Sequence, residues 1–330
     1  MGDSLMLYFV GVVIAWVLSL ILGAFIIPAL RRLKFGQEIR EEGPAWHASK
    51  SGTPTMGGII FIVGAVAALA GVYLWEAIAG TPDISYFNII LMLFLALAFG
   101  AIGFVDDYIK VVKKRNLGLT AAQKFSLQFL VALVFSFIVA TFGEVGTVIE
   151  IPFSGARVDL SWLYIPFVIC VMLATVNSVN LTDGLDGLAT TITLIVSLFY
   201  TVTAAQIDNT AVALFGSVIA GSLIGFLFYN WKPAKVFMGD TGSLFLGGAV
   251  CAMAILMRQP ISLLIVGFVY VAETLSVIIQ VTSYKLTKKR VFKMSPIHHH
   301  FEMCGWRETV IVCVFSAVTL ALCLLMYFWG

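Results

Sequence analysis

The chain has 330 residues, of which 60% are hydrophobic and only 12% are charged, and its mean hydropathy is +1.01. This composition excludes a soluble globular domain of that length and indicates membrane-spanning helices. The net charge of +2 points to no partner, and the five cysteines lack the CxxC spacing of a metal or redox site.

Ten apolar runs follow one another along the chain, and most are long enough to cross about 30 Å of hydrocarbon as a helix. Because the runs are continuous rather than alternating, they predict helices and not a β-barrel. The first run has no preceding Lys or Arg, so we expect a span rather than a cleaved signal. The predicted spans cover about 4–30, 55–75, 86–105, 126–143, 161–177, 188–206, 211–229, 243–258, 261–285 and 308–329.

The basic residues are distributed unevenly between the loops. Of the 20 Lys and Arg residues, all but Arg157 and Arg258 lie in or directly beside alternate loops. The positive-inside rule makes these loops cytoplasmic and places both termini outside. We therefore predict an all-α integral membrane protein that forms one domain over residues 1–330, with its functional site at the cytoplasmic face. The expected cytoplasmic loops are 31–54, 106–125, 177–187, 230–242 and 286–307.

One outer segment, 144–160, differs from the other loops in its residue pattern. Val148-Ile-Glu-Ile and Val158-Asp-Leu flank a stretch that contains Pro152 and Gly155. Two short β-prone runs around Pro and Gly predict a small extracytoplasmic hairpin.

The first acidic segment, Asp106-Asp107-Tyr-Ile-Lys110, directly follows the third apolar run. Neighbouring residues on a helix point in different directions, so one carboxylate would act while the other supports it. Lys110 lies one turn after Asp106 and can neutralise it. The alternative is a solvated helix end with an ordinary ion pair. A charge inside a bilayer costs about 2.5–3.5 kcal/mol, which favours a functional pair.

The second segment runs from Asn177 to Gly187 and holds Asn180, Asp183 and Asp186. Its glycines interrupt the helix, so we expect the acids on a turn whose backbone can approach a ligand closely. Asp186 can also be explained as the cap of the next span. Capping accounts for one acid and leaves the rest of the segment unexplained.

The third segment, Asp240-Thr-Gly-Ser243, precedes the eighth span. Asp240 is either an ordinary N-cap or a metal ligand at a helix N-terminus. Mg²⁺ prefers carboxylate oxygens and usually keeps substrate phosphates as further ligands, and a helix N-terminus also favours phosphate. Acids gathered at one membrane face beside basic loops indicate an enzyme that acts on a phosphorylated substrate.

The fourth segment contains His298, His299, His300 and Glu302. Adjacent histidines converge poorly on one transition metal, so phosphate contact or proton handling is the preferred interpretation. Glu273 is the one acid deep in a span and is a functional candidate by default. It can equally pair with a buried group such as Ser276 or Gln280, and the sequence leaves both readings open.

Together these motifs resemble the phospho-N-acetylmuramoyl-pentapeptide transferases, a branch of the polyprenyl-phosphate N-acetylhexosamine-1-phosphate transferase superfamily. The resemblance extends from Lys50-Ser-Gly-Thr-Pro-Thr-Met-Gly-Gly58, through the three acidic segments, to Pro296-Ile-His-His-His-Phe-Glu302. The acidic segments are similar across the superfamily, whereas the first and last motifs resemble this branch in particular.

The resemblance implies a reaction and its partners. Phospho-MurNAc-pentapeptide would pass from UDP-MurNAc-pentapeptide to undecaprenyl phosphate, giving lipid I and UMP, with Mg²⁺ required. The protein would lie in the bacterial cytoplasmic membrane as a multi-pass homodimer and would bind no nucleic acid.

The resemblance also implies catalytic roles. Asp240 would bind Mg²⁺, and Asp106 would be the catalytic carboxylate with Asp107 beside it. His298 would contact phosphate. Direct displacement with Asp106 as base is favoured over an acyl-phosphate intermediate, although the sequence does not decide between them.

Further residues are implied to bind substrate. Two lysines, Lys110 and Lys124, would hold phosphate oxygens. The other implied positions are Lys50, Asn177, Asn180, Asp183, Asp186, Asn230, Phe237, His299 and His300.

Two rival functions remain. A sister enzyme that uses UDP-GlcNAc would share the acidic segments but lack the triple histidine. A transporter would place its acids near the bilayer midplane between repeats, and no repeat is found here.

The long ninth span, with Thr274, Ser276 and Thr282 as possible bend points, is expected to shape an apolar groove for the lipid.

Overall fold

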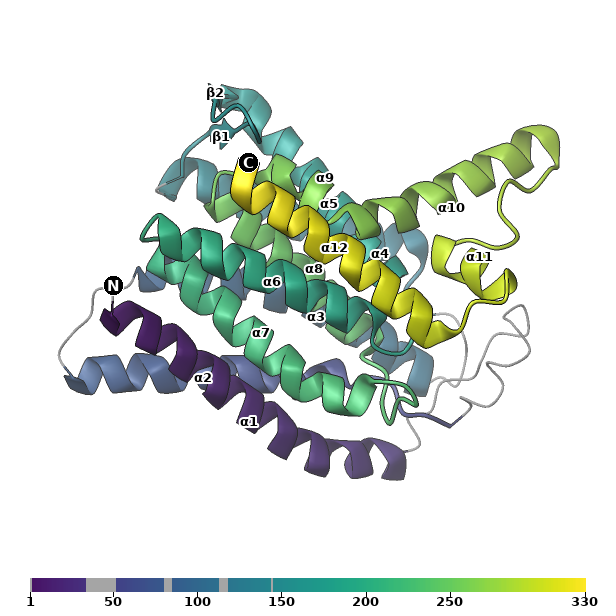
Figure 1. Cartoon of the computed structure of the whole chain (residues 1–330), viewed down its shortest axis with the longest axis horizontal. Helices are drawn as coiled ribbons and strands as arrows, with labels where there is room; N and C mark the ends of the chain where they lie inside the picture. The colour runs from purple at the N-terminus through teal and green to yellow at the C-terminus, as the bar shows by residue number, and fades with distance from the viewer. Residues whose placement is uncertain (1, 34–51, 80–84, 113–117, 144) are drawn as a thin grey trace.

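A computed structural model of the chain describes residues 2–33, 52–79, 85–112, 118–143 and 145–330. Within these ranges the chain is mostly helical (Figure 1). Nine described helices are long and apolar enough to cross a membrane, and a bent helix pair brings the possible total to ten. The predicted all-α membrane protein with about ten spans is therefore confirmed in its helix content and in the number of candidate spans.

The nine long helices are α1 (Gly2–Arg32), α2 (Gly58–Ala79), α3 (Tyr86–Val112), α4 (Ala121–Phe142), α5 (Tyr164–Thr182), α6 (Leu188–Gln206), α7 (Thr210–Asn230), α8 (Gly239–Leu256) and α12 (Glu308–Trp329). The bent pair consists of η3 (Pro260–Ser262) with α9 (Leu263–Val266), followed by α10 (Phe268–Thr287) at an angle of 81°. The shorter elements are β1 (Val148–Glu150), β2 (Arg157–Asp159), η2 (Ser161–Leu163) and α11 (Ile297–Met303).

Several helices extend beyond the predicted apolar runs into the predicted loops. α3 continues past residue 105, α4 begins before 126, α5 continues past 177, and α8 begins before 243. The start of α4 is set by a capping box, in which the Thr120 hydroxyl accepts the Gln123 N–H and the Gln123 amide accepts the Thr120 N–H. Helical hydrogen bonding does not stop where hydrophobicity stops. The loops predicted at 106–125, 177–187 and 230–242 are therefore partly helical.

The loop predicted at 286–307 also contains a helix, α11, which begins after Pro296. This helix carries all three adjacent histidines. Its seven residues are too few and too polar to register as an apolar run, which is why the hydropathy pattern reads as a loop.

The bend of the ninth span does not lie where the hydroxyl side chains predict it. The chain breaks at Gly267, between α9 and α10. Thr274 instead donates a hydrogen bond to Ser178 on α5, and Ser276 donates to the Glu273 carbonyl in its own helix. Because those hydroxyls are satisfied without disturbing the helix, they cause no break. A side chain at Gly267 would lie 2.6 Å from the Leu263 carbonyl oxygen, so glycine suits the break itself.

The predicted hairpin is confirmed, since β1 and β2 pair antiparallel with Ile149 opposite Val158. Figure 1 shows the two chain ends at the same end of the long helices, as an even number of spans requires. The assignment of that end to the outer side of a membrane stays a prediction.

The interior of the bundle is built around α7 and α8, whose apolar segments are 83% and 89% buried. α8 packs against α3 and α5, and α7 packs against α1 and α6. α3 and α8 approach very closely at Gly103, where an added Cβ atom would lie only 2.0 Å from the Asp240 carbonyl oxygen. This contact brings the end of α3 beside the start of α8.

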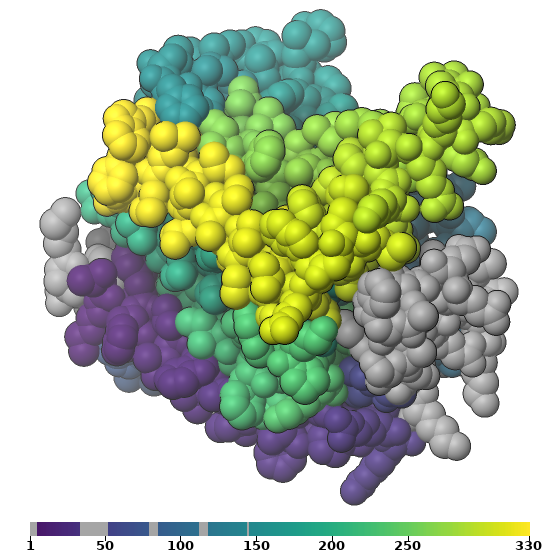
Figure 2. Space-filling model, turned by 45° about the vertical axis from the view of Figure 1, so that its right-hand side comes forward, coloured from purple at the N-terminus to yellow at the C-terminus, as the bar shows by residue number. Residues whose placement is uncertain are grey.

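α10 leaves the bundle obliquely and projects beyond it together with the segment that returns to α11 (Figures 1 and 2). Large apolar side chains along α10 stay exposed, among them Leu275, Ile278 and Leu286. Gln280 ties the returning segment to the helix, because its amide oxygen accepts the N–H groups of Val291 and Phe292.

The close contact at Gly103 predicts a strong asymmetry between two glycine substitutions. Gly103→Ala should lower the free energy of unfolding by about 1–3 kcal/mol, because the new methyl group overpacks a backbone contact. Gly71→Ala in α2 is the matched control, since an added Cβ there meets no atom within 4 Å. It should gain up to about 1 kcal/mol from helix propensity. Thermal unfolding in detergent measures both, and a Gly103→Ala protein as stable as the control would contradict the packing.

Candidate active site

Asp240 lies in the first turn of α8 and is reached by side chains from three other helices. Its Oδ2 accepts from Lys110 Nζ on α3 at 2.8 Å and from Lys124 Nζ on α4 at 3.0 Å. Its Oδ1 accepts from the Asn180 amide on α5 at 2.8 Å. Asn180 also donates to Ser243, one turn further along α8. Four helices thus converge on one carboxylate.

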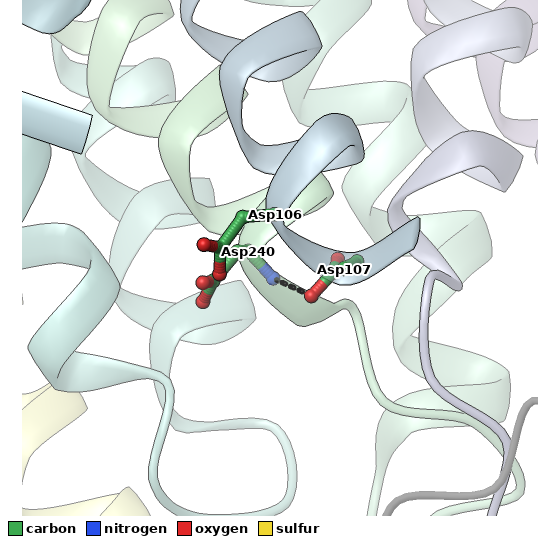
Figure 3. A group of neighbouring side chains, drawn as sticks. All are labelled: Asp106, Asp107 and Asp240. Atoms are coloured by element: carbon green, nitrogen blue, oxygen red, sulfur yellow. Dashed lines mark hydrogen bonds between the residues drawn. The ribbon is translucent and has the colours of Figure 1, made fainter. Parts of the chain in front are cut away.

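Asp106 lies beside Asp240 (Figure 3) and is buried. Its Oδ2 pairs with Lys110 Nζ at 2.6 Å, so that this lysine contacts both carboxylates. Its Oδ1 accepts the Leu119 backbone N–H at 2.7 Å. Gly118 packs against the carboxylate so closely that a Cβ atom there would lie 2.4 Å from Oδ1. The described start of the segment leading to α4 therefore encloses Asp106.

Asp107 points away from its neighbour and caps α8 from the side (Figure 3). It accepts the backbone N–H of Asp240 at 3.2 Å, the N–H of Thr241 at 2.9 Å and the Thr241 hydroxyl at 2.7 Å. The N-cap of α8 is thus supplied by a residue of α3, and the alternative in which Asp240 is an ordinary N-cap is wrong. With the helix capped by Asp107, the carboxylate of Asp240 faces the lysines.

The three aspartates form a donor set suited to a divalent cation. One oxygen from each of Asp106, Asp107 and Asp240 lies within 4.8 Å of the others. Mg²⁺ prefers carboxylate oxygens of this kind. Since Asp107 is committed to the helix cap, Asp106 and Asp240 are the two members of this set that face the lysines and are left for metal binding and catalysis.

Asp183 and Asp186 lie on the turn that follows α5. The pKa of the Asp183 carboxyl is raised well above its usual range. The largest cause is desolvation by burial, and the negative charges of Asp240, Asp107 and Asp186 add to it. The Asp186 carboxylate accepts the Ala234 N–H at 3.1 Å, and its own N–H donates to Glu308 at 2.8 Å. Asp183 therefore belongs to the electrostatics of the site, while Asp186 braces the turn.

Three further predicted residues hold the frame of the site. Asn177 exchanges amide hydrogen bonds with Gln128 and so joins α5 to α4. Asn230 donates to the Val236 carbonyl and accepts from Thr190. Phe237 is bound through its backbone to the segment before α2. Lys50 lies outside the described residues.

The three histidines on α11 have separate partners. His298 Nδ1 lies 3.0 Å from a Glu273 oxygen, and His299 Nδ1 lies 2.6 Å from a Glu302 oxygen. His300 Nδ1 accepts the Lys293 N–H at 3.1 Å. Three rings bound to three different groups do not form a transition-metal site. Contact of His298 with a phosphate stays a prediction.

Comparison with known proteins assigns the family. Residues 89–258 match the model described as Glycosyl transferase family 4, and residues 50–62 match Phospho-N-acetylmuramoyl-pentapeptide-transferase signature 1. The phospho-N-acetylmuramoyl-pentapeptide-transferase of Clostridium novyi (strain NT) is 50% identical over 322 residues, which cover 98% of this chain and 96% of the relative. The chain belongs to the phospho-N-acetylmuramoyl-pentapeptide transferase family. Relatives of the same name from Acetivibrio thermocellus (50% identical, covering 96% of this chain and 93% of the relative) and Thermoanaerobacter sp. strain X514 (49% identical, covering 96% of each) agree.

Some residues of this family member are bound into the site but were missed in the sequence. Gln128 pairs with Asn177, and a polar amide inside an apolar run was an available signal. Glu308 accepts the Asp186 N–H and pairs with Lys232, yet its place at the start of α12 looks like an ordinary acidic first turn. Thr241 completes the cap formed by Asp107, and only its tertiary contact shows this.

An apolar cavity of about 300 Å³ lies beside the bend of the ninth span. Side chains of α5 and of the α9–α10 break line it, including Phe167, Leu264 and Tyr270. An apolar groove for a lipid was predicted beside the ninth span; this cavity lies beside the bend at Gly267, and its use by a lipid stays a prediction.

The raised pKa of Asp183 predicts a pH-dependent effect of its removal. When a carboxyl group has a higher pKa in the folded chain than in the unfolded chain, the folded protein loses stability as the pH rises above the unfolded pKa of about 4. Asp183→Asn should therefore raise the melting temperature at about pH 7, and this gain should disappear at about pH 4. Thermal unfolding in detergent with a chelator present tests it.

Asp159→Asn provides the control of opposite sign. Hydrogen bonds from Thr147 and from the Ser161 N–H lower the pKa of the Asp159 carboxyl. Its replacement should therefore give no gain at neutral pH. Equal gains in the two variants would contradict the electrostatic origin of the effect.

Proposed function

We propose that this protein transfers phospho-MurNAc-pentapeptide from UDP-MurNAc-pentapeptide to undecaprenyl phosphate, giving lipid I and UMP, at the cytoplasmic face of the bacterial cell membrane. The observation that carries this proposal is the pair Asp106 and Asp240, which Lys110 bridges, while Lys124 also contacts Asp240. The names of the relatives support the same activity.

The reaction has to bring two anionic phosphates together. Phosphoryl transfer depends mainly on positioning and on neutralising negative charge that spreads over the phosphate oxygens. Lys110 and Lys124 are the cations nearest to Asp240 among the described residues, and each donates to it. Once a diphosphate enters, these ammonium groups would turn from the carboxylate to the phosphate oxygens.

Asp240 would hold Mg²⁺ in this site. The bound ion would supply positive charge to the UDP phosphates and to the departing UMP. Asn180 fixes the orientation of the Asp240 carboxylate through Oδ1, and Asp107 fixes the helix end that carries it. The protein thus prepares the ligand geometry in advance.

Asp106 is the proposed general base. It would take a proton from the lipid phosphate, which is already a competent nucleophile, and a covalent enzyme intermediate is then unnecessary. The Leu119 N–H holds one of its oxygens while Lys110 holds the other, so the carboxylate has a fixed direction.

The two substrates would enter from different sides. Part of the undecaprenyl chain would lie in the apolar cavity between α5 and the α9–α10 break. The nucleotide would lie on the polar side, against Asn180 and the turn that carries Asp183. The remaining members of the proposed substrate site are Lys50, Asn177, Asp186, Asn230, Phe237, His298, His299 and His300. A homodimer is proposed from the family resemblance.

Release of UMP by purified protein tests the function. With UDP-MurNAc-pentapeptide and undecaprenyl phosphate in detergent, the wild-type protein should form UMP and a lipid-linked product, and a chelator should abolish both. Asp240→Asn should lower kcat by about 10²–10³-fold, since it removes charge from the centre that holds Mg²⁺. Asp106→Asn should lower it by about 10²–10⁴-fold through loss of the base.

Asp159→Asn is the matched control, because the same chemical change falls on the hairpin away from the site. It should keep wild-type turnover. Full activity without Mg²⁺, or UMP release that does not need the lipid phosphate, would contradict the proposed reaction.

A further inference from the structure

Glu273 on α10 is a fully buried acid outside the cluster around Asp240. Its Oε2 contacts His298, and in the described part of the chain its Oε1 has no hydrogen-bond partner. An acid at such depth is costly and is seldom retained without a function. The contacts of Glu273 therefore indicate what it does.

A single oxygen of Glu273 faces two nitrogens of His298. Oε2 lies 3.0 Å from the ring Nδ1 and 3.5 Å from the backbone nitrogen of the same residue. The Glu273 carboxylate can only accept, so the ring hydrogen that faces it is on Nδ1 and points at the same oxygen as the backbone N–H. This arrangement fixes the ring orientation and turns Nε2 away from Glu273.

The other edge of the His298 ring lies against Gly184. A Cβ atom built on Gly184 would lie 2.2 Å from Nε2, and Nε2 itself is buried without a partner among the described residues. Gly184 directly follows Asp183 on the turn after α5. The buried ring thus lies between the acid of α10 and the turn after α5.

We propose that Glu273 is a positioning residue: its carboxylate holds the His298 ring, and the ring, packed against Gly184, holds the turn that follows α5, the helix whose Asn180 donates to Asp240. The consequence for catalysis rests on the proposed function. The mechanical link itself does not, since it concerns only how α10, α11 and the turn are held together.

A series of variants at Glu273 tests the link. Glu273→Gln keeps an oxygen that can accept the Nδ1 hydrogen, whereas Glu273→Leu removes the acceptor. We expect kcat/KM for the nucleotide substrate to fall about 10- to 100-fold in the Leu variant, by analogy with the loss of groups that orient a ligand, and to be largely restored in the Gln variant. The KM for undecaprenyl phosphate should stay unchanged, because the apolar cavity does not involve Glu273.

Ser276→Ala is the matched control for these variants. Ser276 is equally buried on α10, but its hydroxyl donates only to the Glu273 carbonyl within the helix. Its activity should stay within about twofold of wild type, because no contact with His298 is lost.

A double-mutant cycle with His298→Ala separates a shared role from two independent ones. If Glu273 acts through His298, Glu273→Leu should add less than about a twofold loss in the His298→Ala background. Losses that multiply would overturn the proposal, and so would equal changes in the KM of both substrates.

Amide hydrogen exchange gives a readout that does not need turnover. Exchange in the peptide covering 183–187 should be faster in Glu273→Leu and in His298→Ala than in wild type or Ser276→Ala. Unchanged exchange in this turn would overturn the positioning role. A wild-type protein that forms no UMP would instead overturn the proposed function, and the exchange result would still decide the link.

Discussion

The site depends above all on the close approach of α3 and α8 at Gly103. With no Cβ atom at this position, the backbone of α3 lies against the Asp240 carbonyl, and the next turn of α3 reaches the first N–H groups of α8. Asp107 then caps α8 from outside the helix. Because its neighbour Asp106 points the other way, one short stretch of chain both anchors the helix end and supplies the second carboxylate of the acid pair.

The charges of the site are balanced by partners from several helices rather than by solvent. A buried or half-buried carboxylate carries a desolvation cost that close cations and N–H donors offset. Asp240 has two lysines and an amide, and Asp106 has one of those lysines and a backbone N–H. Such a network is stable in the resting chain, yet its two ammonium groups stay available to an incoming phosphate. The two lysines that stabilise the carboxylates in the resting chain are thus the same groups that would bind the substrate phosphates.

The sequence predicts whatever depends on local composition. The spans follow from hydropathy, the hairpin from its turn residues, and the meeting of Asp106, Asn180 and Asp240 from their places at helix ends on one side of the bundle. It does not predict contacts between distant residues: the cap that Asp107 gives to α8, the bond of Glu308 to the Asp186 turn, or the pairing of Glu273 with His298 rather than with Ser276 or Gln280. The position of the ninth-span break was missed for a related reason, because the hydroxyls of Thr274 and Ser276 have other partners in the folded chain.

The arrangement of helices around Asp240 also bears on biosynthesis. The groups that contact this carboxylate come from α3, α4 and α5, which leave the ribosome before it, and the His298 wedge against the Asp183 turn is made only later. A nascent chain that has inserted its first helices therefore carries lysines and acids that still lack their partners. The site can be assembled only near the end of translation, so a partly synthesised chain in the membrane has no reactive centre to expose to lipid phosphates.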